Sequence, residues 1–214
     1  MTDTDAPDRL TLADWRRRVA ELYAAVRAIA RDDPAEAHAR WRAAREALLR
    51  NHPQSPVPAE ARAAFRSAFW DYDPAFRFEI EVQPAPPSAP GALRLDLPNS
   101  GADNQAFERI GSLAIPFAAG ERSLSLFWME GYGGGLFLPF RDASNGTATY
   151  GAGRYLLDTA KSADLGGDPV QGTLVLDFNF AFHPSCAFDP RWACPLAPPE
   201  NRLELEITAG ERLG

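Results

Sequence analysis

The spacing of apolar residues changes near residue 70, and this change constrains the fold more than any other feature of the sequence. Apolar side chains first recur at alternating steps of three and four, at Leu12, Trp15, Val19, Leu22, Val26 and Ile29. Steps of this length place side chains on one face of an α-helix. From residue 76 onward apolar and polar residues alternate, as in "FRFEIEV" (76–82). This period of two is typical of a half-buried strand.

The first 70 residues are predicted to be a helical region of two to three helices. The second helix is expected to begin after Asp33, a natural N-cap that is followed by Pro34 at the first helical position. Pro53 is expected to end it, because proline supplies no backbone donor. A short third helix is predicted over 58–68, where apolar residues again share one face.

Residues 71–214 are predicted to form a β-rich domain. Eight segments with strand character are separated by Gly, Pro and Asn turns: 76–82, 92–97, 108–117, 123–129, 135–140, 149–158, 172–182 and 202–207. Asn145–Gly146 favours a type I′ hairpin. The glycines of "GYGGG" (131–135) indicate a hairpin turn or a close backbone approach. The pattern predicts an α+β fold, with an N-terminal helical arm packed on a mainly antiparallel β-sandwich or barrel.

The charge is distributed unevenly along the chain, and this argues against nucleic acid as a partner. The net charge is −7; residues 1–70 hold 12 basic and 10 acidic side chains, which leaves 10 basic and 19 acidic ones in 71–214. Binding to a phosphate backbone requires a cationic face, which the acidic region does not offer. The apolar runs are too short to span a bilayer, and the N-terminus has no apolar leader. We therefore expect no membrane partner and a cytoplasmic location, and we leave the oligomeric state open.

Familiar catalytic and cofactor motifs do not fit this sequence. "GYGGG" lacks the Lys-Ser/Thr of a phosphate-binding loop and precedes a strand. Neither a serine-hydrolase elbow nor a zinc-protease helix is found. His183, Cys186 and Cys194 could offer three soft ligands, but structural zinc sites normally use more closely spaced pairs. We predict no metal and no cofactor, and two buried thiols in place of a disulfide.

Several polar side chains fall on segments that should be partly buried. Asp177 and Asn179 alternate along one predicted strand and so share a face, where polar groups need partners or a polar cavity. Glu200 and Asn201 follow two prolines at the entrance of another predicted strand. Arg154 can supply the counter-charge for Asp177 or Glu200. These residues are candidates either for a binding site or for an internal hydrogen-bond network.

Three segments resemble motifs of a known family. They are "FRDASNGTATYGAGRYL" (140–156), "LDFNFAFHPSCAFDPRWACPLAPPENRL" (176–203) and "ITAGE" (207–211), and they are similar to the bacterial and archaeal domain-of-unknown-function family 1684. The resemblance marks Asp142, Tyr150, Gly151, Gly153, Arg154, Asp177, Asn179, Cys186, Cys194, Glu200, Asn201 and Glu211. His183 stands where the family usually has Asn, which argues against a zinc ligand or a catalytic base at that position. The resemblance implies where a site lies but no particular chemistry.

Two hypotheses for function follow. In the first, the β-domain binds a small polar or anionic ligand, with or without catalysis, near the motifs 142–154 and 177–202. The predicted ligand-binding residues are Tyr150, Arg154, Asp177, Asn179, Glu200 and Asn201. In the second, the N-terminal helices carry a non-catalytic interaction with a partner, and the polar residues only brace the loop 181–203, with Arg154 as its anchor.

Overall fold

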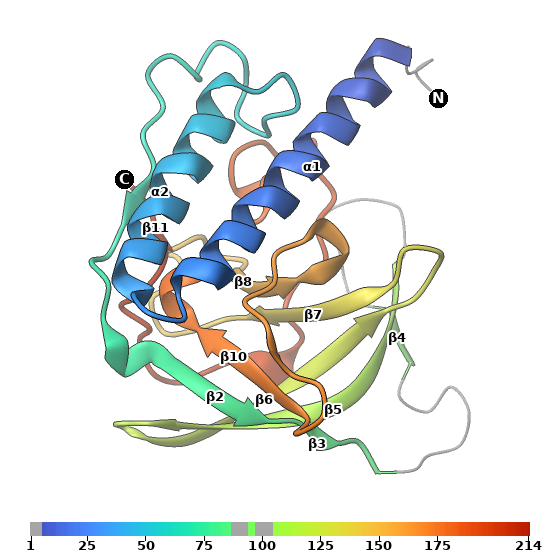
Figure 1. Ribbon diagram of the computed structural model, residues 1–214, viewed down its shortest axis with the longest axis vertical. Helices are drawn as coiled ribbons and strands as arrows, with labels where there is room; N and C mark the ends of the chain where they lie inside the picture. Colours follow the sequence, from blue (N-terminus) through green and yellow to red (C-terminus); the bar gives the residue numbers. More distant parts are fainter. Residues whose placement is uncertain (1–5, 87–93, 97–104) are drawn as a thin grey trace.

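Two long helices form the N-terminal arm, as the apolar spacing predicts. The structure, a computed structural model, describes residues 6–86, 94–96 and 105–214. Helix α1 spans Ala6–Ile29 and helix α2 spans Pro34–Asn51. The Asp33 carboxylate accepts a hydrogen bond from the Glu36 backbone N–H at 3.0 Å, which confirms the predicted N-cap. The two helices lie side by side over one flank of the β-rich region (Figure 1).

The predicted third helix is wrong, because residues 58–67 form turns and irregular chain and the short strand β1 (Ala68–Phe69) follows. Prolines at positions 53, 56 and 58 supply no N–H donors to a helical ladder. The Arg62 guanidinium fills part of this deficit by donating to the carbonyls of Val57, at 2.9 Å, and Ser55, at 3.0 Å. Side-chain hydrogen bonds therefore fix this segment in an irregular path.

The β-rich region contains a large sheet, a smaller sheet and a two-stranded ribbon, all with antiparallel pairing. The large sheet has the order β3-β5-β6-β7-β8, with β4 also paired to β5. Its strands are β3 Gln83–Pro84, β4 Arg94–Asp96, β5 Ala106–Phe117, β6 Gly120–Met129, β7 Gly135–Phe140 and β8 Arg154–Asp158. The smaller sheet has the order β2-β10-β9, with strands β2 Arg77–Glu81, β9 Gly167–Asp168 and β10 Thr173–Asp177. The ribbon pairs β1 (Ala68–Phe69) with β11 (Glu211–Arg212).

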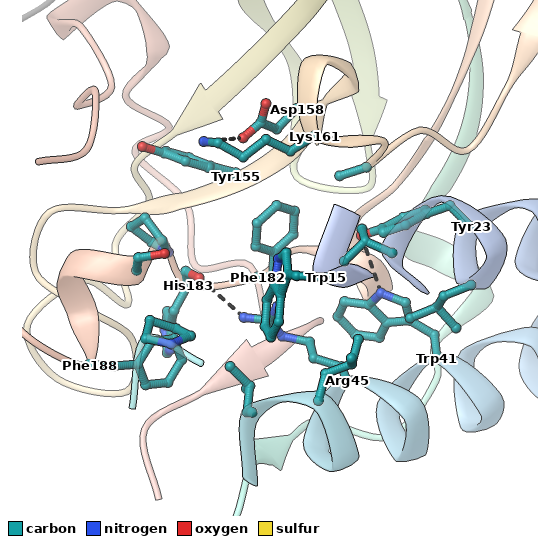
Figure 2. A pocket seen from close by; sticks show the side chains of 18 of the residues that line it. Trp15, Tyr23, Trp41, Arg45, Tyr155, Asp158, Lys161, Phe182, His183 and Phe188 are labelled. Atoms are coloured by element: carbon teal, nitrogen blue, oxygen red, sulfur yellow. Dashed lines mark hydrogen bonds and ion pairs between the residues drawn. The ribbon is translucent and has the colours of Figure 1, made fainter. Parts of the chain in front are cut away.

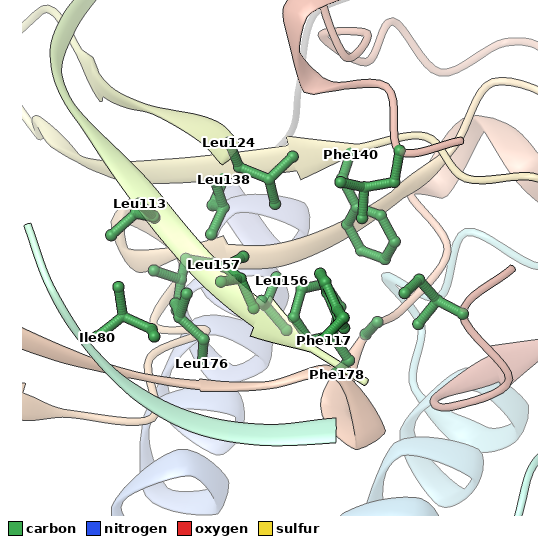
Figure 3. Packing of buried hydrophobic residues seen from close by; sticks show 14 of the residues in the cluster. Ile80, Leu113, Phe117, Leu124, Leu138, Phe140, Leu156, Leu157, Leu176 and Phe178 are labelled. Carbon is green, nitrogen blue, oxygen red and sulfur yellow. The ribbon is translucent and has the colours of Figure 1, made fainter. Parts of the chain in front are cut away.

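An apolar layer lies between the large and the smaller sheet (Figure 3). Leu113 and Leu124 of the large sheet and Leu176 of the smaller sheet are fully buried in it. Phe78 and Ile80 pack into the same layer, which confirms the apolar face predicted for 76–82. The described strands do not close into a barrel. The fold is therefore α+β, with a helical arm on a β-sandwich.

Two predicted strands are longer than the observed ones. The segment 149–158 becomes a strand only at Arg154, where β8 begins. The segment 172–182 leaves the sheet after Asp177, because the Asp177 carboxylate accepts a hydrogen bond from the Asn179 backbone N–H at 3.1 Å. This contact caps a 3-10 turn that replaces the end of the predicted strand.

The segment 202–207, predicted to be a strand, has no strand ladder in the structure. Leu203 and Ile207 are buried, as the apolar alternation requires. However, the Ile207 backbone N–H donates to the Asp142 carboxylate at 2.8 Å, and Arg154 donates to the Ile207 carbonyl at 2.9 Å. Backbone pairing is limited to the first part of the segment, where the Leu203 N–H donates to the Arg141 carbonyl and the Leu205 carbonyl accepts from the Ala143 N–H. The side chains of Asp142 and Arg154 bond its end, which periodicity alone does not reveal.

The predicted type I′ turn at Asn145–Gly146 is also wrong. This turn type requires a positive φ at both residues. Gly146 has a φ of 83°, but among the described non-glycine residues only Ser162 has a positive φ. The glycine-rich segment 131–135, in contrast, does join β6 to β7 as a hairpin, as predicted. A Cβ at Gly135 would lie 2.6 Å from the Ala160 backbone nitrogen, so the backbone approaches closely there.

The helical arm completes a second apolar core against the β-rich region. Trp41 of α2 is buried, its indole N–H donates to the Tyr23 hydroxyl at 3.2 Å, and its ring lies 5.3 Å from that of Phe180. Arg45 of α2 donates to the Glu211 carboxylate of β11 at 2.7 Å. The predicted division at residue 70 stays a prediction, since both parts contribute to this core. No described helix has the combination of length and apolar character that crossing a membrane requires.

Candidate functional site

The Arg154 side chain, predicted to hold an anion, is completely buried and bonded to the protein itself. Its Nη1 donates to the carbonyls of Ala209 and Glu211, and its Nη2 donates to the Ile207 carbonyl and, at 3.4 Å, to the Asp142 carboxylate. The predicted pairing of Arg154 with Asp177 or Glu200 is therefore wrong, because its charge partner is Asp142. Burial lowers the pKa of Arg154 to about 10, so the guanidinium remains charged at neutral pH.

Asp177 and Asn179 form a second, separate network that holds the segment before β2. The Asn179 side chain donates to the Asp73 carbonyl at 2.8 Å and accepts from the Asp73 backbone N–H at 2.9 Å. The Asp177 carboxylate accepts from the Tyr72 hydroxyl and lies 3.5 Å from the Arg77 guanidinium. Burial raises the pKa of Asp177. Both side chains are fully buried, and they join parts of the chain about 100 residues apart in sequence.

Asn201 bridges two strands at a point where proline prevents ordinary pairing. Pro139 of β7 has no backbone N–H to offer the Ser125 carbonyl of β6. The Asn201 amide instead donates to the carbonyls of Ser125 and Pro139, at 2.9 and 2.8 Å, and accepts from the Ser125 N–H at 2.8 Å. Its neighbour Glu200 is exposed to solvent. Of the predicted pair, Asn201 is therefore buried in the interior and Glu200 is not.

Tyr150 lies in a third place, beside a histidine and two thiols. Its backbone N–H donates to His183 Nε2 at 3.2 Å, which leaves the histidine proton on Nδ1. Its hydroxyl contacts the Cys186 thiol, and burial together with this contact raises the pKa of Tyr150 to about 12. Cys186 and Cys194 are both buried thiols, as predicted.

A pocket lies between the helical arm and the loop that follows β10 (Figure 2). Its volume is about 110 Å³. The apolar part of its wall is formed by residues from α1, α2, β8 and the loop, namely Trp15, Val19, Leu22, Trp41, Leu48, Leu49, Tyr155, Phe182 and Phe188. None of the six predicted ligand-binding residues is among the described residues that line it. The structure thus brings together a different set of side chains from the predicted one.

The charged groups of the pocket are paired within the protein. Arg45 is bonded to Glu211 at 2.7 Å, and Lys161 is bonded to Asp158 at 3.0 Å. His183 also lines the pocket, and burial lowers its pKa to about 4, so it is neutral at pH 7. The arrangement therefore offers an apolar, charge-balanced space.

The two tryptophans of the arm have different surroundings, and Trp41 is buried in the core that joins the arm to the β-rich region. Trp15 is half-buried and also lies in the pocket wall. The sequence signal for this pocket was the concentration of aromatic residues in two places: in the arm, with Trp15 and Trp41, and in the loop, with Phe182 and Phe188. Which of these rings would meet could not be inferred from spacing, because arm and loop lie more than 130 residues apart.

The fold and the pocket define a β-sandwich capped by two helices, with an apolar space at the junction. The family model described as protein of unknown function (DUF1684) matches residues 64–212, and the chain belongs to this family. A similar solved structure is the solution NMR structure of an uncharacterized protein from gene locus rrnAC0354 of Haloarcula marismortui. It is 30% identical, with a TM-score of 0.58, and the match covers 80% of this chain and 90% of that one. No curated protein matches the chain.

Replacing Asn201 with alanine should lower the free energy of unfolding by about 3 kcal/mol, because three buried backbone groups lose their partner. Glu200→Ala, at the exposed neighbouring position, should change it by less than about 0.5 kcal/mol. Urea unfolding of both variants measures the difference. Equal effects of the two substitutions would show that Asn201 is not a bridge.

Arg154→Ala should loosen the C-terminal segment and not the loop 181–203 as a whole. The carbonyls that bond Arg154 belong to Ile207, Ala209 and Glu211. Hydrogen exchange should therefore become faster at the backbone amides of Ile207, Glu211 and Leu213, with little change in the strands β5 and β6. Faster exchange confined to 181–203 would restore the predicted role of Arg154 as the anchor of that loop.

Two buried histidines should make the protein less stable in mild acid. Burial lowers the pKa of both His38 and His183 from 6.5 to about 4. The folded state then binds fewer protons than the unfolded state between pH 4 and 6.5, so the free energy of unfolding decreases as the pH falls through this window. Each histidine accounts for up to about 3 kcal/mol.

The measurement is urea unfolding between pH 7 and pH 4 for the wild type and for His38→Phe. The ring of His38 packs against Trp41 and Phe180, so phenylalanine keeps the aromatic contacts and removes the titrating group. The variant should lose about half as much stability over the window. The same pH dependence in both proteins would be incompatible with a buried neutral His38.

Proposed function

We propose that the pocket between the helical arm and the β-sandwich binds a small, uncharged and largely apolar molecule. The observation that carries the proposal is the composition of the wall, in which aromatic rings from α1 and from the loop face one space (Figure 2). Concave, mainly apolar spaces with a few polar groups are the usual form of a small-molecule site. We assign binding to this pocket and no reaction.

The charge of the ligand follows from the pairing of the wall residues. A charged ligand would have to leave water and compete for Arg45 or Lys161 with the carboxylates that already hold them. The sequence favoured a small polar or anionic ligand, with Arg154 as its counter-charge. Arg154 is already hydrogen-bonded to carbonyls and to the Asp142 carboxylate, so it does not offer its charge to an anionic ligand.

One polar contact is available to an uncharged ligand. The Tyr23 hydroxyl accepts the indole N–H of Trp41, and its own hydrogen has no acceptor among the described residues. Tyr23 lines the pocket and is only 4% exposed. A ligand hydroxyl or carbonyl could accept this hydrogen. The ligand that suits the wall best therefore has an apolar body and one neutral oxygen.

The size of the pocket limits the ligand to a few non-hydrogen atoms. An apolar cavity of about 150 Å³ is known to hold benzene, and the present volume is about 110 Å³. Because the exposed Lys161 also lines the pocket, a substituent on a benzene-sized ring can reach solvent, and molecules with about six to nine non-hydrogen atoms are the appropriate probes. Affinities for such small molecules are expected to be near the millimolar range, since few contacts are made.

The alternative that the arm is an interaction module stays a prediction. In its favour, Leu10 and Leu12 near the start of α1 are exposed, at 71% and 38%. Against it, the buried Trp41 faces the β-rich region and the half-buried Trp15 faces the pocket. Removing the arm would expose Phe180 and the other apolar residues that it covers, so an arm-less protein should aggregate.

Thermal unfolding with three related probes tests the proposal: benzyl alcohol, benzoate and benzylamine. Benzyl alcohol at ten times its Kd should stabilise the protein by about 1.4 kcal/mol, which corresponds to a rise in Tm of about 2–5 °C. The two charged probes should give smaller shifts at the same concentration. Absence of a shift with all three would overturn the proposal.

Two variants of α1 provide the site control. Val19→Phe fills the pocket, whereas Ala24→Phe places the same side chain at an exposed position of the same helix. Benzyl alcohol should raise the Tm of the Ala24 variant and leave that of the Val19 variant unchanged. Equal shifts in the two variants would place any binding outside this pocket.

A further inference from the structure

Cys186 and Cys194 belong to the same loop, the one that follows β10, and the two residues are in direct contact. The Cys186 backbone N–H donates to Cys194 Sγ at 3.3 Å, and the two thiols are hydrogen-bonded to each other. The side chains are only 6% and 7% exposed. Two sulfur atoms in contact need to move by only about 1–2 Å to reach the length of a disulfide bond.

Ordered backbone on both sides of the pair keeps the sulfurs together. Cys186 lies in a 3-10 turn, Ser185–Ala187, in which the N–H groups of Ala187 and Phe188 donate to the carbonyls of Pro184 and Ser185. The Pro195 carbonyl, next to Cys194, accepts the Tyr155 hydroxyl. Between the cysteines, Asp189 caps the next turn by accepting from the Arg191 backbone N–H at 2.9 Å. The contact is therefore part of a fixed loop and not a chance approach of two mobile ends.

From this geometry we infer that Cys186 and Cys194 are a redox-active pair that closes to an internal disulfide within the native fold, by exchange with a low-molecular-weight disulfide. In the first step the thiolate of one cysteine attacks a sulfur of the small disulfide, which releases one small thiol and leaves a mixed disulfide. In the second step the other cysteine, after losing its proton, attacks the protein sulfur of that mixed disulfide and releases the second small thiol. The pair is oxidised by two electrons, and the small disulfide is reduced to two thiols.

The surroundings of the pair set the rate of this exchange. The hydrogen bond between the two thiol side chains and burial raise the pKa of the Cys194 thiol, and they outweigh the opposite effect of the Cys186 backbone N–H. Because only the thiolate reacts, exchange is slow at neutral pH and becomes about tenfold faster for each unit of pH while the thiols remain mostly protonated. The pair is thus a slow dithiol that responds to sustained oxidation and not to brief exposure.

Oxidation would also change the pocket, because Cys194 forms part of its wall. A bond between Cys186 and Cys194 fixes that part of the wall in place. The inference itself does not depend on the proposed ligand, since it concerns the two thiols alone. Failure of probe binding would therefore leave it standing, and failure of disulfide formation would leave the proposed pocket standing.

The experiment treats the folded full chain with oxidised glutathione at pH 8 and follows its intact mass and its thiol content. We expect the loss of two hydrogens and of both titratable thiols, with the near-UV circular dichroism spectrum of the native protein retained. Dithiothreitol should reverse the change. In Cys186→Ser and Cys194→Ser, the remaining thiol should give at most a mixed disulfide, seen as a gain in mass.

Three results would overturn the inference. The first is that both thiols persist in the folded protein even at pH 9 and over about a hundred times the period in which guanidine-unfolded protein is oxidised, since the raised pKa slows the exchange but does not prevent it. The second is a stable mixed disulfide on the wild type, which would show that the second sulfur does not reach the first. The third is an internal disulfide that forms only with loss of the native near-UV spectrum, which would show that the native loop does not accommodate the bond.

Discussion

A buried guanidinium loses its hydration, and the surrounding protein has to replace it. The two terminal nitrogens of Arg154 meet this requirement with three carbonyls of the C-terminal segment and with the Asp142 carboxylate, while its Nε has no partner among the described residues. Its carbon Cζ lies over the rings of Trp70 and Phe140, at 5.4 and 5.2 Å. This one side chain thus bonds three carbonyls of the C-terminal segment, which has few strand contacts of its own.

The helical arm depends on the same segment. Glu211 accepts hydrogen bonds from Arg45 of α2 and, at 2.7 Å, from the His183 backbone N–H. Its backbone carbonyl in turn accepts from Arg154. One residue of the C-terminal segment therefore joins the arm, the loop after β10 and the buried guanidinium. The pocket lies between two of these parts, the arm and the loop, so its shape depends on contacts made by residues far apart in sequence.

The sequence was sufficient for the parts of the fold that periodicity controls. Both long helices follow from the spacing of residues such as Val19 and Val26, and the apolar face of β2 follows from strict alternation. The segment 202–207 follows this rule only in part: its alternation reports burial, and its first residues pair with the backbone after β7, but Ile207 is bonded by the side chains of Asp142 and Arg154. Periodicity reports which face is buried and does not report what the backbone is bonded to.

The candidate site was harder to predict for a related reason. Polar residues in a family motif, such as Asp177 and Asn201, were expected either to lie together around a ligand or to form one internal hydrogen-bond network. Each in fact satisfies backbone groups in a different place, because buried donors and acceptors within the fold need partners as much as a ligand does. The pocket is instead built mainly from apolar residues, which sequence reasoning assigns to the core. Trp15 and Phe182 line the same pocket, but no pattern in the sequence around either residue indicates that they meet.

The central claim is that the space for a ligand lies between the helical arm and the β-sandwich, while the polar motif residues hold the fold together. A crystal structure under xenon pressure tests it most directly, since xenon binds in apolar cavities without requiring a polar partner. The account predicts a xenon atom bounded by Trp15, Val19 and Phe182. A pocket without xenon, or xenon found only beside Tyr150, Asp177 or Glu200, would contradict it.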